Sequence, residues 1–137
     1  MSGKLLKRSL FALVLLASPT AAETGRWLNA ADITYMLVGR DVVGQYRNGA
    51  TFTETYRGVG TIEYRDETSS LRGTWTLKGN QFCTHYEGSP GGCYKMRLTS
   101  SNCFEYWLVD AAGTPADAWI AVASQAKYDS TCREKTP

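Results

Sequence analysis

The chain has 137 residues, with 15 basic and 13 acidic side chains, four cysteines and one histidine. Three of the 15 basic residues lie in the first 22, so the remaining 115 residues carry 12 basic against 13 acidic side chains, a net charge of −1. This balance excludes the electropositive footprint of a nucleic-acid-binding domain. A length of 115 residues suits one domain with one modest core.

Residues 1–22 have the three-part layout of a secretory signal peptide: a basic start, a short apolar run from Leu10 to Ala17, and small residues before Glu23. We expect cleavage after Ala22, which leaves residues 23–137 as a single β-rich domain with a frayed C-terminal tail. The apolar run is shorter than the roughly 20 residues of a membrane span, although an uncleaved anchor is the alternative. We therefore expect a periplasmic or secreted monomer without a stable membrane span after cleavage.

All four cysteines (Cys83, Cys93, Cys103 and Cys132) lie in the expected domain. An even number in a small exported domain is typical of disulfides, and four cysteines allow three pairings. Zinc is the alternative, but the chain has no Cys-x-x-Cys spacing and a single histidine. Our first choice is Cys83–Cys93, which closes a short loop, with Cys103–Cys132, which ties the polar tail to a central strand.

The segment from Arg26 to Gly39 predicts one short amphipathic helix. Asn29 is a suitable N-cap, and Ile33, Met36 and Leu37 fall on one helical face before the glycine stop. A helix of this length is not stable alone in water, so we expect its apolar face to pack on a sheet.

After Gly39 the hydrophobic pattern changes to a period of two, which predicts short antiparallel strands. Asn48-Gly49 indicates a hairpin because both residues tolerate positive φ, and Glu87–Gly92 (EGSPGG) predicts a loop. The fold class is therefore mainly β: an antiparallel meander that curls into a small barrel or sandwich, with one helix and disulfide staples. The predicted strands cover residues 41–47, 51–57, 60–65, 71–77, 81–86, 93–99, 102–110 and 118–124.

One carboxylate stands out among the strand residues. Glu54 shares a strand face with Phe52 and Tyr56, and a carboxylate that points into a core needs a partner. Our interpretation is that this face is solvated, or that Arg57 or Arg65 pairs with Glu54.

Sixteen aromatic residues include four tryptophans spread along the chain: Trp27, Trp75, Trp107 and Trp119. That spread favours a shared core over a single surface patch, although a stacking platform for a ligand is the alternative. The residues that we select as candidates to face a ligand are Trp75, Tyr86, His85 and Glu54.

His85 is the candidate for catalysis, because it shares a strand face with Cys83 and precedes Glu87 by two residues. A cysteine–histidine nucleophilic pair needs a free thiolate, and an expected disulfide at Cys83 removes it. No Gly-x-Ser-x-Gly elbow, phosphate-binding glycine loop or His-Glu-x-x-His helix is present in the sequence. We expect neither a cofactor nor a metal site.

Several motifs together resemble a family of small exported bacterial domains of unknown function: the lead-in LNAADITYMLVG, the run GxxFxxxY, the GTW strand and the C…CY pair. The resemblance covers Leu28 to Trp107 and implies a short helix before an antiparallel meander with a cysteine pair. The order is also loosely similar to bacterial periplasmic protease-inhibitor barrels, from whose single-disulfide pattern Cys103 and Cys132 depart. No functional residue is carried over.

The leading hypothesis is an exported, non-enzymatic binding module whose ligand is a protein, a cell-envelope component or a small apolar molecule. A second is an inhibitor of a protease or lysozyme, which a protruding loop at 87–92 would favour. A third is a small hydrolase, which a cleft joining His85 to Glu87 or Glu54 would favour.

Overall fold

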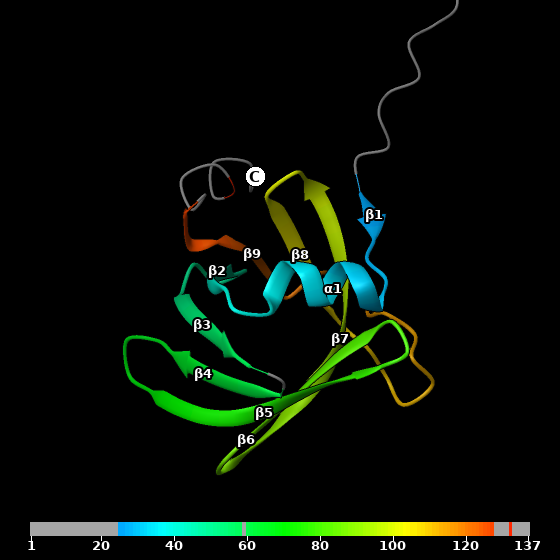
Figure 1. The fold of residues 1–137 in the computed structure, drawn as a ribbon. Helices are drawn as coiled ribbons and strands as arrows, with labels where there is room; N and C mark the ends of the chain where they lie inside the picture. Colours follow the sequence, from blue (N-terminus) through cyan, green and yellow to red (C-terminus); the bar gives the residue numbers. More distant parts are fainter. Residues whose placement is uncertain (1–24, 59, 128–131, 133–137) are drawn as a thin grey trace, which may run out of the picture.

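The computed structural model describes residues 25–58, 60–127 and 132. The expected signal peptide, its cleavage after Ala22 and most of the polar tail lie outside the described residues. Within them the chain is mainly β, with strands that close into one antiparallel barrel and one short helix (Figure 1). The sequence predicted a barrel or a sandwich, and the structure shows the barrel. In the part of the chain that is described, no helix is long and apolar enough to cross a membrane.

Eight of the described strands form the barrel as a simple meander, in which each strand pairs with the next along the chain. The barrel closes because β9 pairs with β2 as well as with β8. A two-residue strand, β1 (Arg26–Trp27), pairs with β7 from outside the barrel. The barrel strands are β2 (Asp41–Tyr46), β3 (Thr51–Arg57), β4 (Thr61–Arg65), β5 (Ser70–Lys78), β6 (Gln81–Tyr86), β7 (Ser89–Ser100), β8 (Cys103–Leu108) and β9 (Ala121–Gln125).

The predicted loop at 87–92 is wrong. Only Glu87 and Gly88 form the turn, and β7 already begins at Ser89. The glycines after Pro90 mislead because they belong to a β-bulge, where the register between β6 and β7 shifts around His85. Gly91 has a φ of +64°, and a Cβ there would lie 2.0 Å from the Thr84 carbonyl oxygen, so the bulge requires glycine.

The Asn48-Gly49 hairpin lies where the sequence predicted it, between β2 and β3. Its turn differs, because only Gly49 adopts a positive φ (+89°). The Gly49 amide donates to the Tyr46 carbonyl at 2.9 Å, as in a type I turn followed by a left-handed glycine.

Helix α1 (Ala30–Leu37) begins where the sequence predicted, at the N-cap Asn29. The Asn29 side chain accepts from the Asp32 amide, and the Asp32 carboxylate accepts from the Asn29 amide, which completes a capping box. Ile33 and Leu37 are fully buried, so the predicted apolar face does pack on the sheet.

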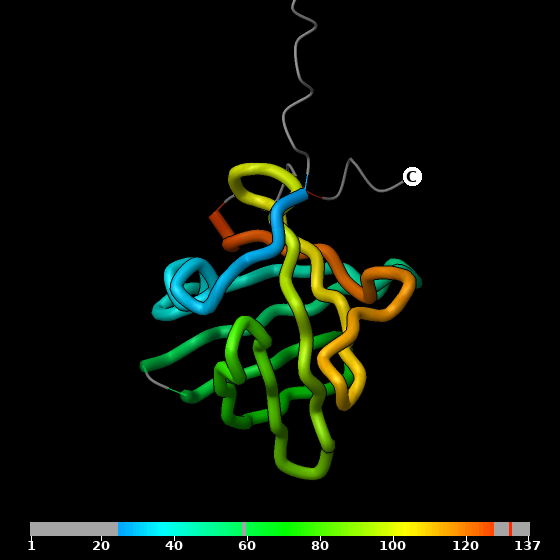
Figure 2. The backbone as a smooth tube through the Cα atoms, turned by 90° about the vertical axis from the view of Figure 1, so that its right-hand side faces the viewer, coloured from blue at the N-terminus to red at the C-terminus, as the bar shows by residue number. Residues whose placement is uncertain are grey.

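The helix lies across one end of the barrel. At its start, the Ala30 amide donates to Asn80 Oδ1 in the β5–β6 turn at 3.0 Å. Near its end, Gln125 Nε2 at the end of β9 donates to the Met36 carbonyl at 3.3 Å. Figure 2 shows the helix (cyan) at one end of the barrel and the connection 109–120 (orange) at the other. We call the end that the helix covers the helix end, and the opposite end the open end.

The tryptophans do not share a core, contrary to the prediction. Trp75 alone is buried, with 7% of its surface exposed, whereas Trp27 is 45% exposed. Trp27 packs edge-on against Trp107 with ring centroids 5.7 Å apart, outside the barrel. Trp119 is half-buried near the open end, where the Arg47 guanidinium lies 5.4 Å from its ring centroid. Alternation within strands, rather than hydrophobicity, decides which aromatic residues point inward.

Both predicted disulfides are confirmed: Cys83–Cys93 and Cys103–Cys132. Cys83 and Cys93 are directly opposite each other on β6 and β7, with their Cα atoms 4.0 Å apart. The second bridge ties residue 132 to the first residue of β8, at the helix end.

Candidate functional site

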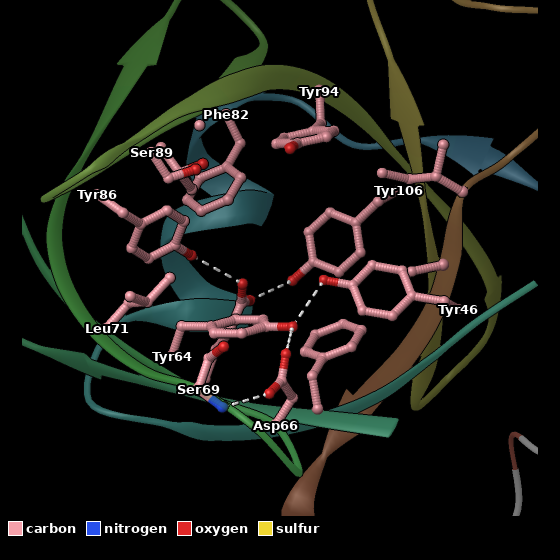
Figure 3. Close-up of a pocket in the computed structure, with 16 residues that line it drawn as sticks. Tyr46, Tyr64, Asp66, Ser69, Leu71, Phe82, Tyr86, Ser89, Tyr94 and Tyr106 are labelled. Atoms are coloured by element: carbon pink, nitrogen blue, oxygen red, sulfur yellow. Dashed lines mark hydrogen bonds between the residues drawn. The ribbon is translucent and has the colours of Figure 1, made fainter. Parts of the chain in front are cut away.

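The open end of the barrel leads into a cavity of about 330 Å³. Figure 3 shows aromatic side chains pointing into it from strands on all sides. The size is near the lower limit of pockets that hold small organic ligands. The lining residues are Tyr46, Phe52, Glu54, Tyr64, Asp66, Ser69, Leu71, Phe82, Thr84, Tyr86, Ser89, Gly91, Tyr94, Tyr106, Ile120 and Ala121.

Two inward-facing glycines make room for the aromatic wall. A Cβ at Gly44 would lie 2.2 Å from the ring of Phe52, its cross-strand neighbour. A Cβ at Gly73 would lie 2.8 Å from the ring of Tyr86, which is opposite it on β6. Each ring therefore lies over the backbone of the adjacent strand and leaves the centre of the barrel free.

Glu54 lies at the bottom of the cavity, in the middle of β3, and 8% of its surface is exposed. Three tyrosine hydroxyls from three different strands contact its carboxylate. Tyr106 donates to Oε2 at 3.3 Å, Tyr86 donates to Oε1 at 3.2 Å, and Tyr56 also donates to Oε2. The Tyr86 and Tyr106 hydroxyls point toward the centre of the cavity in Figure 3. We call these four residues the Glu54 cluster.

Burial raises the pKa of Glu54, because the interior solvates the carboxylate less well than water does. The three tyrosine hydrogen bonds act in the opposite direction and lower that pKa. Burial, followed by the charge of Glu54, raises the pKa values of Tyr56, Tyr86 and Tyr106, so these phenols remain protonated donors at neutral pH.

A second polar group lies at the mouth of the cavity. The hydroxyls of Tyr46 and Tyr64 are 3.2 Å apart, and the Tyr64 hydroxyl donates to the Asp66 carboxylate at 2.9 Å. The backbone amides of Thr68 and Ser69 also donate to Asp66, at 2.8 and 2.7 Å. The Thr68 amide first, and then the Tyr64 hydroxyl, hold the pKa of Asp66 below its usual range, so it is ionised at neutral pH.

The polar side chains of the cavity carry one sign of charge. Its described lining includes two carboxylates, Glu54 and Asp66, and no lysine, arginine or histidine. Such a site can accept hydrogen bonds from a ligand, hold a positive charge, or exchange a proton through the buried Glu54 carboxyl. Among the described residues, no three His, Cys, Asp or Glu side chains are grouped so that they could hold a metal ion.

The structure brings two of the four predicted ligand-facing residues together. Glu54 and Tyr86 both line the cavity and are hydrogen-bonded to each other. Trp75 lies in the core, against Tyr56, and His85 is exposed on the outer face of β6. Our interpretation of the Glu54 face as solvated, or as paired with an arginine, is wrong, because this face is the inner one. Contact of these residues with a ligand stays a prediction.

Sequence reasoning missed the other tyrosines of the site, although a pattern for them exists. In a meander, β2, β4, β6 and β8 all run in the same direction. Tyr46, Tyr64 and Tyr86 are the last or next-to-last inward residues of the first three, and Tyr106 occupies the second half of β8. Aromatic residues at these positions gather at one end of a closed barrel. The sequence did not indicate that Asp66 belongs to the site, because this residue lies in a turn rather than in a strand.

A scan against protein-family models finds no match to this chain. A search of curated proteins and a search of solved structures find no match either. The resemblance to small exported domains and to inhibitor barrels thus has no support beyond the quoted motifs. A function for this chain is therefore inferred from the geometry of the cavity.

Proposed function

We propose that the protein is an exported, non-enzymatic binding module that holds a small, largely apolar or aromatic molecule inside its barrel. The observation that carries this proposal is the cavity itself: about 330 Å³ of space, open at one end, between aromatic walls. A protein interior is normally close-packed, so a barrel with such a space lacks packing contacts that would otherwise stabilise the fold there. Eight-stranded barrels are just wide enough to hold one small ligand.

The two other hypotheses find less support. An inhibitory loop at 87–92 would need to protrude, whereas residues 89–92 belong to β7, and Ser89 and Gly91 border the cavity. A hydrolase that uses His85 would need a cleft joining it to Glu87 or Glu54. Neither His85 nor Glu87 lines the cavity that contains Glu54. His85 and Glu54 lie on opposite faces of the barrel wall, and the cysteine beside His85 is in a disulfide.

Binding of a neutral fluorophore tests the proposal. N-phenyl-1-naphthylamine is uncharged at neutral pH and brightens in an apolar environment, so we expect its emission to rise saturably with the mature domain. Ser89→Trp, which adds an indole at the cavity mouth, should weaken binding at least tenfold. Thr74→Trp, which adds the same ring on the exposed outer face of β5, should leave binding unchanged.

A fluorescence rise that Ser89→Trp leaves intact would place the fluorophore on the surface and contradict the proposal. So would the absence of any rise with a folded protein. Turnover of a generic ester by the wild type, lost in His85→Ala, would favour the hydrolase instead.

A further inference from the structure

The charged side chains at the bottom and at the mouth of the cavity are both negative. Glu54 lies at the bottom and Asp66 at the mouth, and none of the other described lining residues carries a charge. Low-dielectric walls focus the field of such carboxylates into the space between them. Such a field attracts cations and repels anions.

The Glu54 cluster surrounds the carboxylate with hydrogen-bond donors. Hydroxyls of Tyr56, Tyr86 and Tyr106 are all within hydrogen-bond reach of the two carboxylate oxygens, which only accept when ionised. Phenol donors share the negative charge but do not neutralise it. A buried charge is costly unless an opposite charge is close, and burial does raise the pKa of Glu54. None of the described residues that line the cavity supplies the cluster with a cationic partner.

The aromatic wall suits a cation as well. Phe52 and Tyr64 are stacked with centroids 5.9 Å apart, Tyr64 meets Tyr86 at 5.8 Å, and Tyr94 meets Tyr106 at 6.0 Å. Ring faces attract ammonium groups within about 6 Å, and more strongly where water is excluded. The same rings bury the apolar body of a ligand.

We propose that the ligand of the cavity is a small organic cation: a protonated amine on an aromatic or apolar body, with its ammonium group directed at Glu54. This inference rests on the proposed binding function and names its ligand class. The ammonium group donates to the Glu54 carboxylate, the body packs against the aromatic wall, and Asp66 attracts the cation at the mouth. Phenols that already donate to Glu54 hold the carboxylate in place before the ligand arrives, which reduces the ordering cost of binding.

Three probes of nearly equal size separate the contributions: 2-phenylethylamine (cationic), 2-phenylethanol (neutral) and phenylacetate (anionic). Each is titrated into the mature domain loaded with N-phenyl-1-naphthylamine, and displacement gives its affinity. We expect the amine to bind at least tenfold more tightly than the alcohol, and phenylacetate to bind most weakly. Glu54→Gln should reduce the affinity of the amine to the level of the alcohol.

Glu63→Gln is the matched control. It removes one negative charge from the same sheet, but Glu63 lies on β4 next to Arg57, with Nε and Oε2 3.6 Å apart, and does not line the cavity. We expect this variant to keep the preference for the amine. Equal weakening of the amine by both variants would show a long-range charge effect and overturn the assignment to Glu54.

A pH series is measured on the wild type, so its outcome does not depend on whether a variant folds. Because the amine binds the ionised carboxylate, its affinity should rise with pH through the raised pKa of Glu54 and then level off, while the affinity of the alcohol stays flat. An amine that binds no better than the alcohol, or with a flat pH profile, overturns the cation assignment while fluorophore binding preserves the proposed function. If the fluorophore and all three probes fail to bind, both proposals fall.

Discussion

The two ends of the barrel use the same inward alternation of side chains for opposite purposes. At the helix end, Ile62, Met96 and Phe104 are fully buried, and Ile33 and Leu37 of the helix cover that end. Toward the open end the barrel strands carry tyrosines and Glu54 around a cavity. Packing at one end stabilises the fold, so that the other end can keep space and polar groups that a core would exclude. The predictions below test this division.

The largest effect is expected from the same substitution made at each end. Phe104→Ala removes a fully buried ring at the helix end, where the vacated volume is sealed, and should lower the free energy of unfolding by about 3–5 kcal/mol. Phe52→Ala removes a ring that borders the cavity, so the new space joins an existing one. We expect its cost to be at least about 1 kcal/mol smaller. Urea denaturation of both variants measures the difference, and equal losses would show that the open end is packed as tightly as the helix end.

The two disulfides should also differ. Cys103–Cys132 spans 29 residues and ties the tail to the helix end, whereas Cys83–Cys93 spans 10 within the wall of the barrel. Constraint of the unfolded chain then gives about 4 kcal/mol for the longer loop and about 3 kcal/mol for the shorter one. Paired Cys→Ala variants, compared by the denaturant midpoint at equal slope, test the order. A larger loss from removing Cys83–Cys93 would contradict it.

The open end should respond to pH in a way that the helix end does not. Burial raises the pKa of Glu54 above its ordinary value of about 4.5, so the folded chain holds this proton at a pH where the unfolded chain has released it. The free energy of unfolding should therefore fall as pH rises from about 4.5 through the folded pKa, and the stabilisation by the protonated form is lost there. Glu54→Gln should remove that decline.

Urea titrations between pH 4 and 8, in the absence of ligand, measure this decline. Asp32 and Asp66 act in the opposite direction, because their pKa values are lowered from 3.8, and their stabilisation is nearly complete by about pH 5. A wild-type profile parallel to that of Glu54→Gln would refute the role of Glu54.

The smallest effect is expected at the start of the helix. Asn29→Ala removes the side-chain acceptor of the Asp32 amide and should lower the free energy of unfolding by about 1 kcal/mol. Tyr35→Ala on the exposed face of the same helix, where 72% of the residue surface is accessible, should change it by less than about 0.5 kcal/mol. Thermal unfolding of the two variants separates the loss of the cap from the loss of another side chain of the same helix. Equal shifts of the unfolding midpoint would exclude a special role for the cap.

Local patterns account for what the sequence predicted. The capping residue Asn29, the period-two strands and the pairing of Cys83 with Cys93 all depend on residues close together in the chain. Glu54 could not be placed in the same way, because alternation shows which residues share a face but not which face lies inside. That depends on the pairing of β9 with β2, across about 80 residues of sequence. The glycines at 91 and 92 misled for a related reason: a bulge and a loop have similar compositions.

Closure of the meander also limits how other chains can attach to it. Every described barrel strand has a hydrogen-bonded neighbour on both sides, and β1 covers the part of β7 near Arg97 and Leu98 that extends past β6. A long row of unpaired backbone amides and carbonyls, which another polypeptide would need in order to add itself as a further strand, is therefore missing from the described barrel. A protein that docks on the described barrel would therefore contact its side chains rather than pair with a strand edge, and the same closure protects the folded domain from edge-to-edge aggregation.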